Sequence, residues 1–212
     1  MEGRKFVDAY LDVEQNKLGD KFRKTFFLQT KGHPLFTVEL FREMKEHAMI
    51  VRDDAGRWIE GKTFDWNRLP TRVDAVINER INRLTENMRN ILLIASIEGE
   101  EFTAEVVIRQ LNIDERELIG ILSSELEKRH QLVSAKGIKT LFNQRISLYT
   151  FRHIMFQKYL YNTLDEIERV HLHEQVREII EELYGENTDE VSVQLARHFH
   201  EAGIPAKAFE YL

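Results

Sequence analysis

Apolar residues recur at helical spacing along nearly the whole chain, and this period limits the possible folds more than any other feature. One early example is the set Phe22, Phe26 and Phe27, and a later one is the set Val73, Val76, Ile77, Ile81 and Leu84. Residues three or four positions apart lie on one face of an α-helix and can pack into a core. With 212 residues, 42% of them hydrophobic, the chain can form one or two ordinary cores. The pattern predicts a mainly α protein.

Several classes of protein are excluded by what the sequence lacks. No apolar run reaches the roughly 20 residues that a membrane-spanning helix needs. The N-terminal residues do not follow the basic-then-apolar order of a secretion signal. The chain has no cysteine, which excludes disulfides, thiolate zinc sites and a cysteine nucleophile. We therefore expect no membrane partner, and a cytoplasmic location by default.

The negative charge is concentrated near the C-terminus. Residues 165–212 carry a net charge of −8, whereas the first 164 residues carry +2. Proteins that bind nucleic acids usually concentrate positive charge on one face. Neither part of the chain is basic enough to suggest such a face.

The segment Gly56–Thr63, "GRWIEGKT", fits the G-x-x-x-x-G-K-[ST] pattern of a nucleotide phosphate loop. Such a loop follows a buried strand and leads directly into a helix. Here two β-favouring runs, Met49–Arg52 and Arg57–Ile59, flank a turn at residues 53–56, which predicts a small hairpin. The Glu60 carboxylate would also repel a phosphate. We therefore predict no phosphate loop, no catalytic residue and no hydrolysis by this chain alone.

The middle of the chain has the element order of a winged-helix domain. A helix that follows Thr85 precedes two further predicted helices, residues 103–111 and 114–129. Branched and aromatic runs then predict two strands, Gln131–Ala135 and Arg145–Phe151. Three helices and a two-stranded wing are typical of the winged-helix fold. The expected N-caps along the chain are Thr85, Thr103, Asp114 and Asp165.

Many winged helices bind DNA through their third helix. In this chain that segment, "DERELIGILSSELEKR", has five acidic and three basic residues and would repel the DNA backbone. Its apolar set, which includes Leu118, Leu122 and Leu126, describes a face packed on a core. We expect DNA contact to be absent.

The C-terminal segment, residues 165–212, predicts three helices. The first ends at Gly185, and Pro205 opens the last. Such a helical hairpin buries little surface alone and is typical of an α-α repeat. Its histidines occur in two pairs, each two positions apart, so the members of a pair face different sides of a helix. We therefore predict no metal site at His171, His173, His198 and His200.

Four stretches together resemble the post-catalytic half of the STAND signalling ATPases, multidomain relatives of the plant disease-resistance NTPases. In chain order they are "QTKGHPLFTVELFREM", "ASIEGEEFTAEVV", "FRHIMFQKYLY" and "QLARHFHEAGIPAKAFEYL". In that family a phosphate-loop domain is followed by a helical lid, a winged helix and tetratricopeptide-like repeats. The resemblance spans nearly the whole chain and implies these last three parts without the first. It implies domains at residues 1–84 (a lid with a short β-hairpin), 85–164 (a winged helix with a small β wing) and 165–212 (the start of an α-α repeat segment).

The resemblance also implies a few nucleotide-contacting residues. The family's G-x-P motif matches Gly32 and Pro34, and the family's proline lies against the adenine ring. The winged-helix histidine, which reaches the β-phosphate of ADP, matches His153. In the plant members the next residue is aspartate, and here it is Ile154, so a role for that aspartate in locking the inactive state does not carry over. The same residues also have plainer interpretations, a helix-start turn at Gly32 and Pro34 and a capping or core role for His153.

The resulting hypothesis is a regulatory fragment of a STAND-type ATPase switch. It would close over ADP or ATP held by a missing N-terminal phosphate-loop domain and contact a protein partner through its helical repeats. No cofactor is expected for the isolated chain. The alternative is a free-standing winged-helix and repeat adaptor that binds protein or DNA, and an enzyme based on residues 56–63 ranks third.

Overall fold

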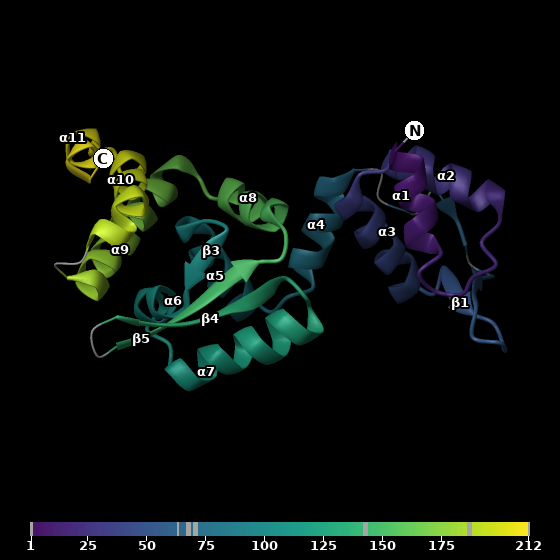
Figure 1. The fold of residues 1–212 in the computed structure, drawn as a ribbon, viewed down its shortest axis with the longest axis horizontal. Helices are drawn as coiled ribbons and strands as arrows, with labels where there is room; N and C mark the ends of the chain where they lie inside the picture. Colours follow the sequence, from purple (N-terminus) through teal and green to yellow (C-terminus); the bar gives the residue numbers. More distant parts are fainter. Residues whose placement is uncertain are drawn as a thin grey trace. The chain divides into compact units, whose positions relative to one another are not determined.

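The computed structural model describes residues 2–62, 64–66, 69, 72–141, 144–185 and 188–211 (Figure 1). Helices make up 65% of the chain and strands 13%, which confirms the mainly α class. The chain divides into two compact units, Met1–Asn82 and Arg83–Leu212. The division into three domains stays a prediction. None of the helices in these ranges is long and apolar enough to cross a membrane.

In its described residues, the first unit packs four α-helices and a small hairpin around an aromatic core. Phe22 and Phe26 are fully buried, and their rings stack with centroids 5.7 Å apart. The helical period of these residues explains the packing, because it places both rings on one face of their helix. The elements are α1 (Glu2–Leu11), α2 (Asp20–Thr30), α3 (Pro34–Glu46), β1 (Ile50–Arg52), β2 (Trp58–Glu60) and α4 (Val73–Asn82).

The hairpin predicted around residues 53–56 is present. Strands β1 and β2 pair antiparallel, with Val51 opposite Ile59. The Asp53 carboxylate closes the turn by accepting from the backbone N–H of Ala55 and of Arg57, each at 3.0 Å. Residues 56–62 of the phosphate-loop pattern thus form a turn and a strand, and Thr63 lies outside the described residues.

Two glycines let α1 approach the turn before α3. Gly32 has φ +72°, a conformation that other residues rarely adopt. A Cβ atom at Gly32 would lie 2.5 Å from the Cα of Gly3 and 2.7 Å from its carbonyl oxygen. Only a residue without a side chain fits between these two backbones.

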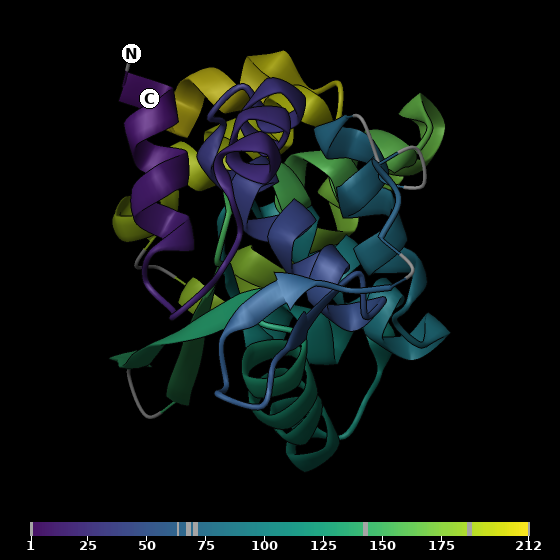
Figure 2. The same ribbon diagram turned by 90° about the vertical axis from the view of Figure 1, so that its right-hand side faces the viewer.

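The second unit consists of helices around a three-stranded antiparallel sheet, followed by a helical hairpin. Helix α7 continues as a π-helix, η2, which packs along β4 (Figures 1 and 2). The elements are α5 (Glu86–Glu98), β3 (Glu101–Thr103), α6 (Ala104–Leu111), α7 (Glu115–Gly120), η2 (Ile121–Arg129), β4 (Val133–Leu141), β5 (Gln144–Phe151), α8 (Ile154–Thr163), α9 (Glu166–Tyr184), the 3-10 helix η3 (Thr188–Val191), α10 (Ser192–Glu201), α11 (Pro205–Ala208) and the 3-10 helix η4 (Phe209–Tyr211).

Three of the four expected caps hold their helices as predicted. The side chains of Thr85, Asp114 and Asp165 each accept from a backbone N–H in the first turn of α5, α7 and α9. Thr103 does precede α6, but its hydroxyl makes no cap. It bonds instead to the buried carboxylate of Glu98, at 3.2 Å. A bond to the end of α5, five positions earlier, therefore replaces the cap.

The wing is longer than the sequence predicts. The first wing strand was predicted to end at Ala135, whereas β4 extends past Gly137 and reaches Leu141. Gly137 has φ +143°, and the register with β5 shifts between Ala135 and Gly137. This is a β-bulge, in which an extra residue is accommodated without ending the strand.

A third strand, β3, was not predicted. It pairs with β5 over three residues, from Glu101 opposite Thr150 to Thr103 opposite Leu148. Just beyond that pairing, the backbone N–H of Ser147 donates to both carboxylate oxygens of Glu105, at 2.9 and 3.0 Å. Ser147, the first residue of β5 past Leu148 that is not paired with β3, is thus bonded to a side chain of α6.

Candidate functional site

The predicted adenine contact lies at the start of α3. Pro34 is the first residue of this helix and is exposed to solvent. His33 caps the helix, because its Nδ1 accepts from the backbone N–H of Phe36 at 3.3 Å. The predicted helix start is confirmed. The Gly32 backbone has a packing role of its own against Gly3.

The predicted phosphate contact lies between β5 and α8. His153 is the N-cap of α8, and its Nδ1 accepts from the backbone N–H of Met155 at 3.2 Å. Because Nδ1 accepts, the proton of the neutral ring is on Nε2, which is therefore a hydrogen-bond donor. Pro34 and His153 belong to different units, and their sharing of one nucleotide stays a prediction.

One group of side chains in the first unit has ligand types suitable for a metal. Glu43 lies in the last turn of α3, His47 is the C-cap residue of that helix, and Glu79 lies on α4; their ligand atoms are within 4.8 Å of one another. His47 Nε2 is 2.6 Å from a Glu43 oxygen and 3.4 Å from a Glu79 oxygen. These ligand types suit zinc, and a histidine bridging two carboxylates accounts for the same geometry. The expectation of no metal site stays a prediction.

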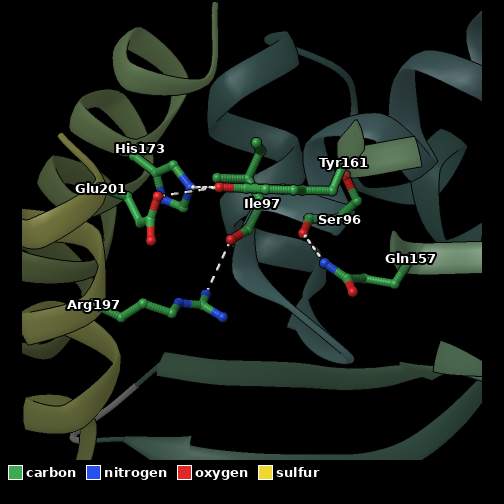
Figure 3. Close-up of a pocket in the computed structure, with 7 residues that line it drawn as sticks. All are labelled: Ser96, Ile97, Gln157, Tyr161, His173, Arg197 and Glu201. Carbon is green, nitrogen blue, oxygen red and sulfur yellow. Dashed lines mark hydrogen bonds between the residues drawn. The ribbon is translucent and has the colours of Figure 1, made fainter. Parts of the chain in front are cut away.

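A cavity of about 210 Å³ in the second unit is a site that the sequence did not predict (Figure 3). It lies where four helices, α5, α8, α9 and α10, come together. Positively charged, negatively charged and uncharged polar side chains all line this cavity. Its lining residues are Ser96, Ile97, Gln157, Tyr161, His173, Arg197 and Glu201.

Two buried histidines connect this cavity to the interior of the helical hairpin. His173 and His198 are 1% and 0% exposed, and their Nδ1 atoms are 2.8 Å apart. On its other nitrogen, His173 is 3.0 Å from the hydroxyl of Tyr161. The Nε2 atom of His198 is 3.4 Å from a guanidinium nitrogen of Arg197. The contacts form one continuous chain of polar groups.

The hydrogen bonds that connect Arg197, His198, His173, Tyr161 and Glu201 can all be assigned donors in one consistent direction. Arginine can only donate, so His198 Nε2 accepts from Arg197 and the His198 proton is on Nδ1. His173 then accepts at Nδ1 and donates from Nε2 to the Tyr161 oxygen. The Tyr161 hydroxyl donates to Glu201 at 3.4 Å. The reverse assignment would place two donors together at Arg197, so the chain runs from the cation to the carboxylate with both imidazoles neutral.

Burial and nearby cations keep both imidazoles uncharged. Burial lowers the pKa of His173 to about 4, and the positive charges of Arg197 and Arg169 add to this effect. Burial also lowers the pKa of His198 far below its ordinary value, with further repulsion from Arg197, His173 and Arg177. Both rings are therefore neutral at pH 7.

A buried carboxyl group, that of Glu98 at the end of α5, lies close to this series of hydrogen-bonded side chains. Burial raises the pKa of its carboxyl group to about 7, although hydrogen bonds from Thr103 and Gln194 and the charge of Arg197 oppose the rise. The Thr103 backbone N–H donates at 2.9 Å, and the Gln194 side-chain amide donates at 3.3 Å. Glu98 thus joins the end of α5 to α10.

Arg197 caps the C-terminal end of α5. Its Nη2 donates to the carbonyl oxygen of Ile97 at 3.0 Å and also to that of Glu98. A cation at this position compensates the negative end of the helix dipole. Gly99 follows with φ +125°, and a Cβ atom there would lie 3.0 Å from Nη1 of Arg197. The helical hairpin is therefore fastened to α5 by charge as well as by packing.

The sequence contained a partial signal for this site. In each of the two His-x-His pairs, one member faces solvent and the other falls on the apolar stripe of its helix, beside Val176 in α9 and Phe199 in α10. The prediction that paired histidines face different sides agrees with the structure. The contact between the two inner members depends on how the helices pack, which the sequence period does not specify.

No protein-family model, curated protein or solved structure matches this chain. The resemblance to the STAND ATPases therefore depends on the sequence alone, that is, on the four stretches and the motif matches at Gly32, Pro34 and His153.

Proposed function

We propose that the chain is the regulatory part of a STAND-type ATPase switch. Residues 1–84 would form the lid, residues 85–164 the winged helix and residues 165–212 the start of the tetratricopeptide-like repeats. ADP or ATP would be bound by a phosphate-loop domain encoded before Met1. The chain itself would hydrolyse nothing, and its repeats would contact a protein partner.

The geometry at His153 is the observation that carries this proposal. Its Nδ1 accepts from the first turn of α8, which leaves the proton of the neutral ring on Nε2. An N–H donor is what a contact to a β-phosphate oxygen requires. The exposed position of Pro34 at the start of α3 also supports an apolar contact with a base.

The element order of the second unit supports the winged-helix assignment. A helix, a short strand, two helices and a β-hairpin follow one another from α5 to β5, and the sheet order is β3-β5-β4. The third helix begins with Glu115 and Glu117 in its first turn. Its acidic start argues against a DNA-binding role.

A switch of this kind needs a nucleotide that contacts its two arrangements differently. A β-phosphate contact made by His153 only in the closed arrangement would provide that difference. Exchange of ADP for ATP would then shift the winged helix and release an output domain.

The proposal is tested by nucleotide retention in the full-length protein. We expect His153→Ala to release ADP about ten-fold faster, because one hydrogen bond to a charged group is lost. His153→Asn should do the same while keeping an N-cap acceptor for α8. Bound nucleotide is measured by chromatography after denaturation, and release by exchange with a fluorescent ADP analogue.

His171→Ala, at an exposed position of α9, is the control and should retain ADP like the wild type. Unchanged retention in both His153 variants would remove the role proposed for this residue. A coding sequence with no phosphate-loop domain before Met1 would favour the free-standing adaptor instead.

A further inference from the structure

The cavity between α5, α8, α9 and α10 has opposite charges at its rim. Arg197 and Glu201 lie one turn apart on α10, and both line the cavity (Figure 3). Residues at this spacing on a helix commonly form an ion pair. Among the described side chains no such pair joins them, since Arg197 reaches toward the end of α5 and Glu201 toward Tyr161. The helix thus presents a cation and an anion to one cavity.

Each of these charged groups retains bonding capacity. Nη2 of Arg197 makes the bonds to α5, while its Nη1 donates to none of the residues that the structure describes. Glu201 accepts at one oxygen from Tyr161, at 3.4 Å, which is a long hydrogen bond. A ligand with an anionic and a cationic group would provide a partner for Arg197 and for Glu201.

The remaining lining groups are suited to a small polar molecule. Gln157 donates from its amide nitrogen to the carbonyl oxygen of Ser96 at 2.7 Å, so its oxygen remains able to accept. The Ile97 side chain supplies an apolar surface. The volume of about 210 Å³ lies below the range of roughly 300–1,000 Å³ that drug-sized ligands occupy. The occupant must therefore be small.

We propose that this cavity binds a small zwitterion, a free α-amino acid with a short side chain. The carboxylate of the ligand lies against Arg197 and its ammonium group against Glu201. Gln157 and Tyr161 complete the hydrogen bonds of the ammonium group. Nucleotides and other polyanions are excluded, because Glu201 repels them and the volume is too small.

Binding here would also affect the hairpin. The ammonium group of the ligand competes with Tyr161 for Glu201, and Tyr161 ends the polar chain that continues through His173 to His198. The ligand is thus placed where the helical hairpin meets α5 and α8. If the chain is the regulatory part of an ATPase switch, which is the function proposed above, the amino acid is a signal that the switch senses.

The binding experiment uses the chain alone, without nucleotide. Glycine, L-alanine and L-serine are titrated calorimetrically at pH 7.5, with acetate and methylamine as probes that each carry one of the two charges. We expect saturable binding of at least one amino acid and no measurable binding of acetate or methylamine at the same concentrations. Glu201→Gln should weaken that binding at least about ten-fold, because it removes the charge and preserves the shape.

The matched control is Glu174→Gln, an exposed acid of α9 outside the cavity, which should bind like the wild type. The inference is overturned if none of the three amino acids binds up to about 10 mM, which corresponds to a binding free energy of roughly −3 kcal/mol. Equal binding by wild type and Glu201→Gln also overturns it. ADP retention is measured separately, so failure of this site and failure of the nucleotide switch are distinguishable.

Discussion

Acidification from pH 7.5 to pH 5 is expected to lower the unfolding free energy of a Glu98→Gln variant, by about 2 kcal/mol from His173 alone and further through His198. The cause is the pair of buried imidazoles. Each has a folded-state pKa far below the value of about 6.5 in an unfolded chain. Between these values the unfolded state binds more protons than the folded state, so stability falls as the pH decreases. His173 contributes about 1.4 kcal/mol per pH unit between pH 6.5 and pH 4, and His198 contributes in the same direction.

In the wild type, Glu98 opposes this loss. Its folded-state pKa of about 7 lies above its unfolded value. Between the two values the folded state holds the extra proton, so this group stabilises the fold as the pH decreases. The wild type should therefore lose clearly less stability than Glu98→Gln over the same pH interval. Glutamine at position 98 removes this opposition and keeps an oxygen that can accept from Thr103.

The measurement is urea unfolding at the two pH values. Both tryptophans, Trp58 and Trp66, belong to the first unit, so their fluorescence reports on that unit, whereas far-UV circular dichroism reports on both. His200→Gln replaces an exposed histidine of α10 and is the control, with the pH dependence of the wild type expected. Equal stability of Glu98→Gln at pH 7.5 and pH 5 would mean that the two imidazoles are not held neutral.

Replacement of Gly32 by alanine should destabilise the first unit by about 3 kcal/mol. Part of the loss comes from the left-handed backbone, which costs a residue with a Cβ atom roughly 1 kcal/mol. The rest comes from the contact of 2.5 Å that the new Cβ would make with Gly3, because two backbones must separate to relieve it. Tryptophan fluorescence during urea unfolding measures the effect.

Gly56→Ala separates these two causes. Gly56 has φ +75°, nearly the same as Gly32, but nothing lies within 4 Å of the position of its Cβ. We expect this variant to lose only about 1 kcal/mol. Similar losses for the two variants would show that the Gly3 contact contributes nothing. A large difference would show that the contact with Gly3 accounts for most of the loss at position 32.

The features predicted correctly from the sequence are those with local causes. A capping side chain bonds within the next three residues, so Thr85, Asp114 and Asp165 could be recognised without knowledge of the fold. The hairpin around Asp53 is likewise set by a turn and its two flanking runs. The proline at the start of α3 belongs to the same class, since its effect is confined to the first turn.

The features that were missed depend on contacts between distant residues. Strand β3 has three residues and exists because it pairs with β5, which lies more than 40 positions later. The contact of His173 with His198 joins residues 25 positions apart, and no local pattern specifies it.

The bond between Glu105 and Ser147 has a consequence for how molecules of this protein meet. Strand β5 continues for several residues beyond the end of β3, and there its outer side offers backbone groups to which a strand from another molecule could add. The carboxylate already occupies the first of these amides and places a negative charge beside it. Intermolecular sheet extension, a common route to aggregation, is thereby opposed at the position where it would begin.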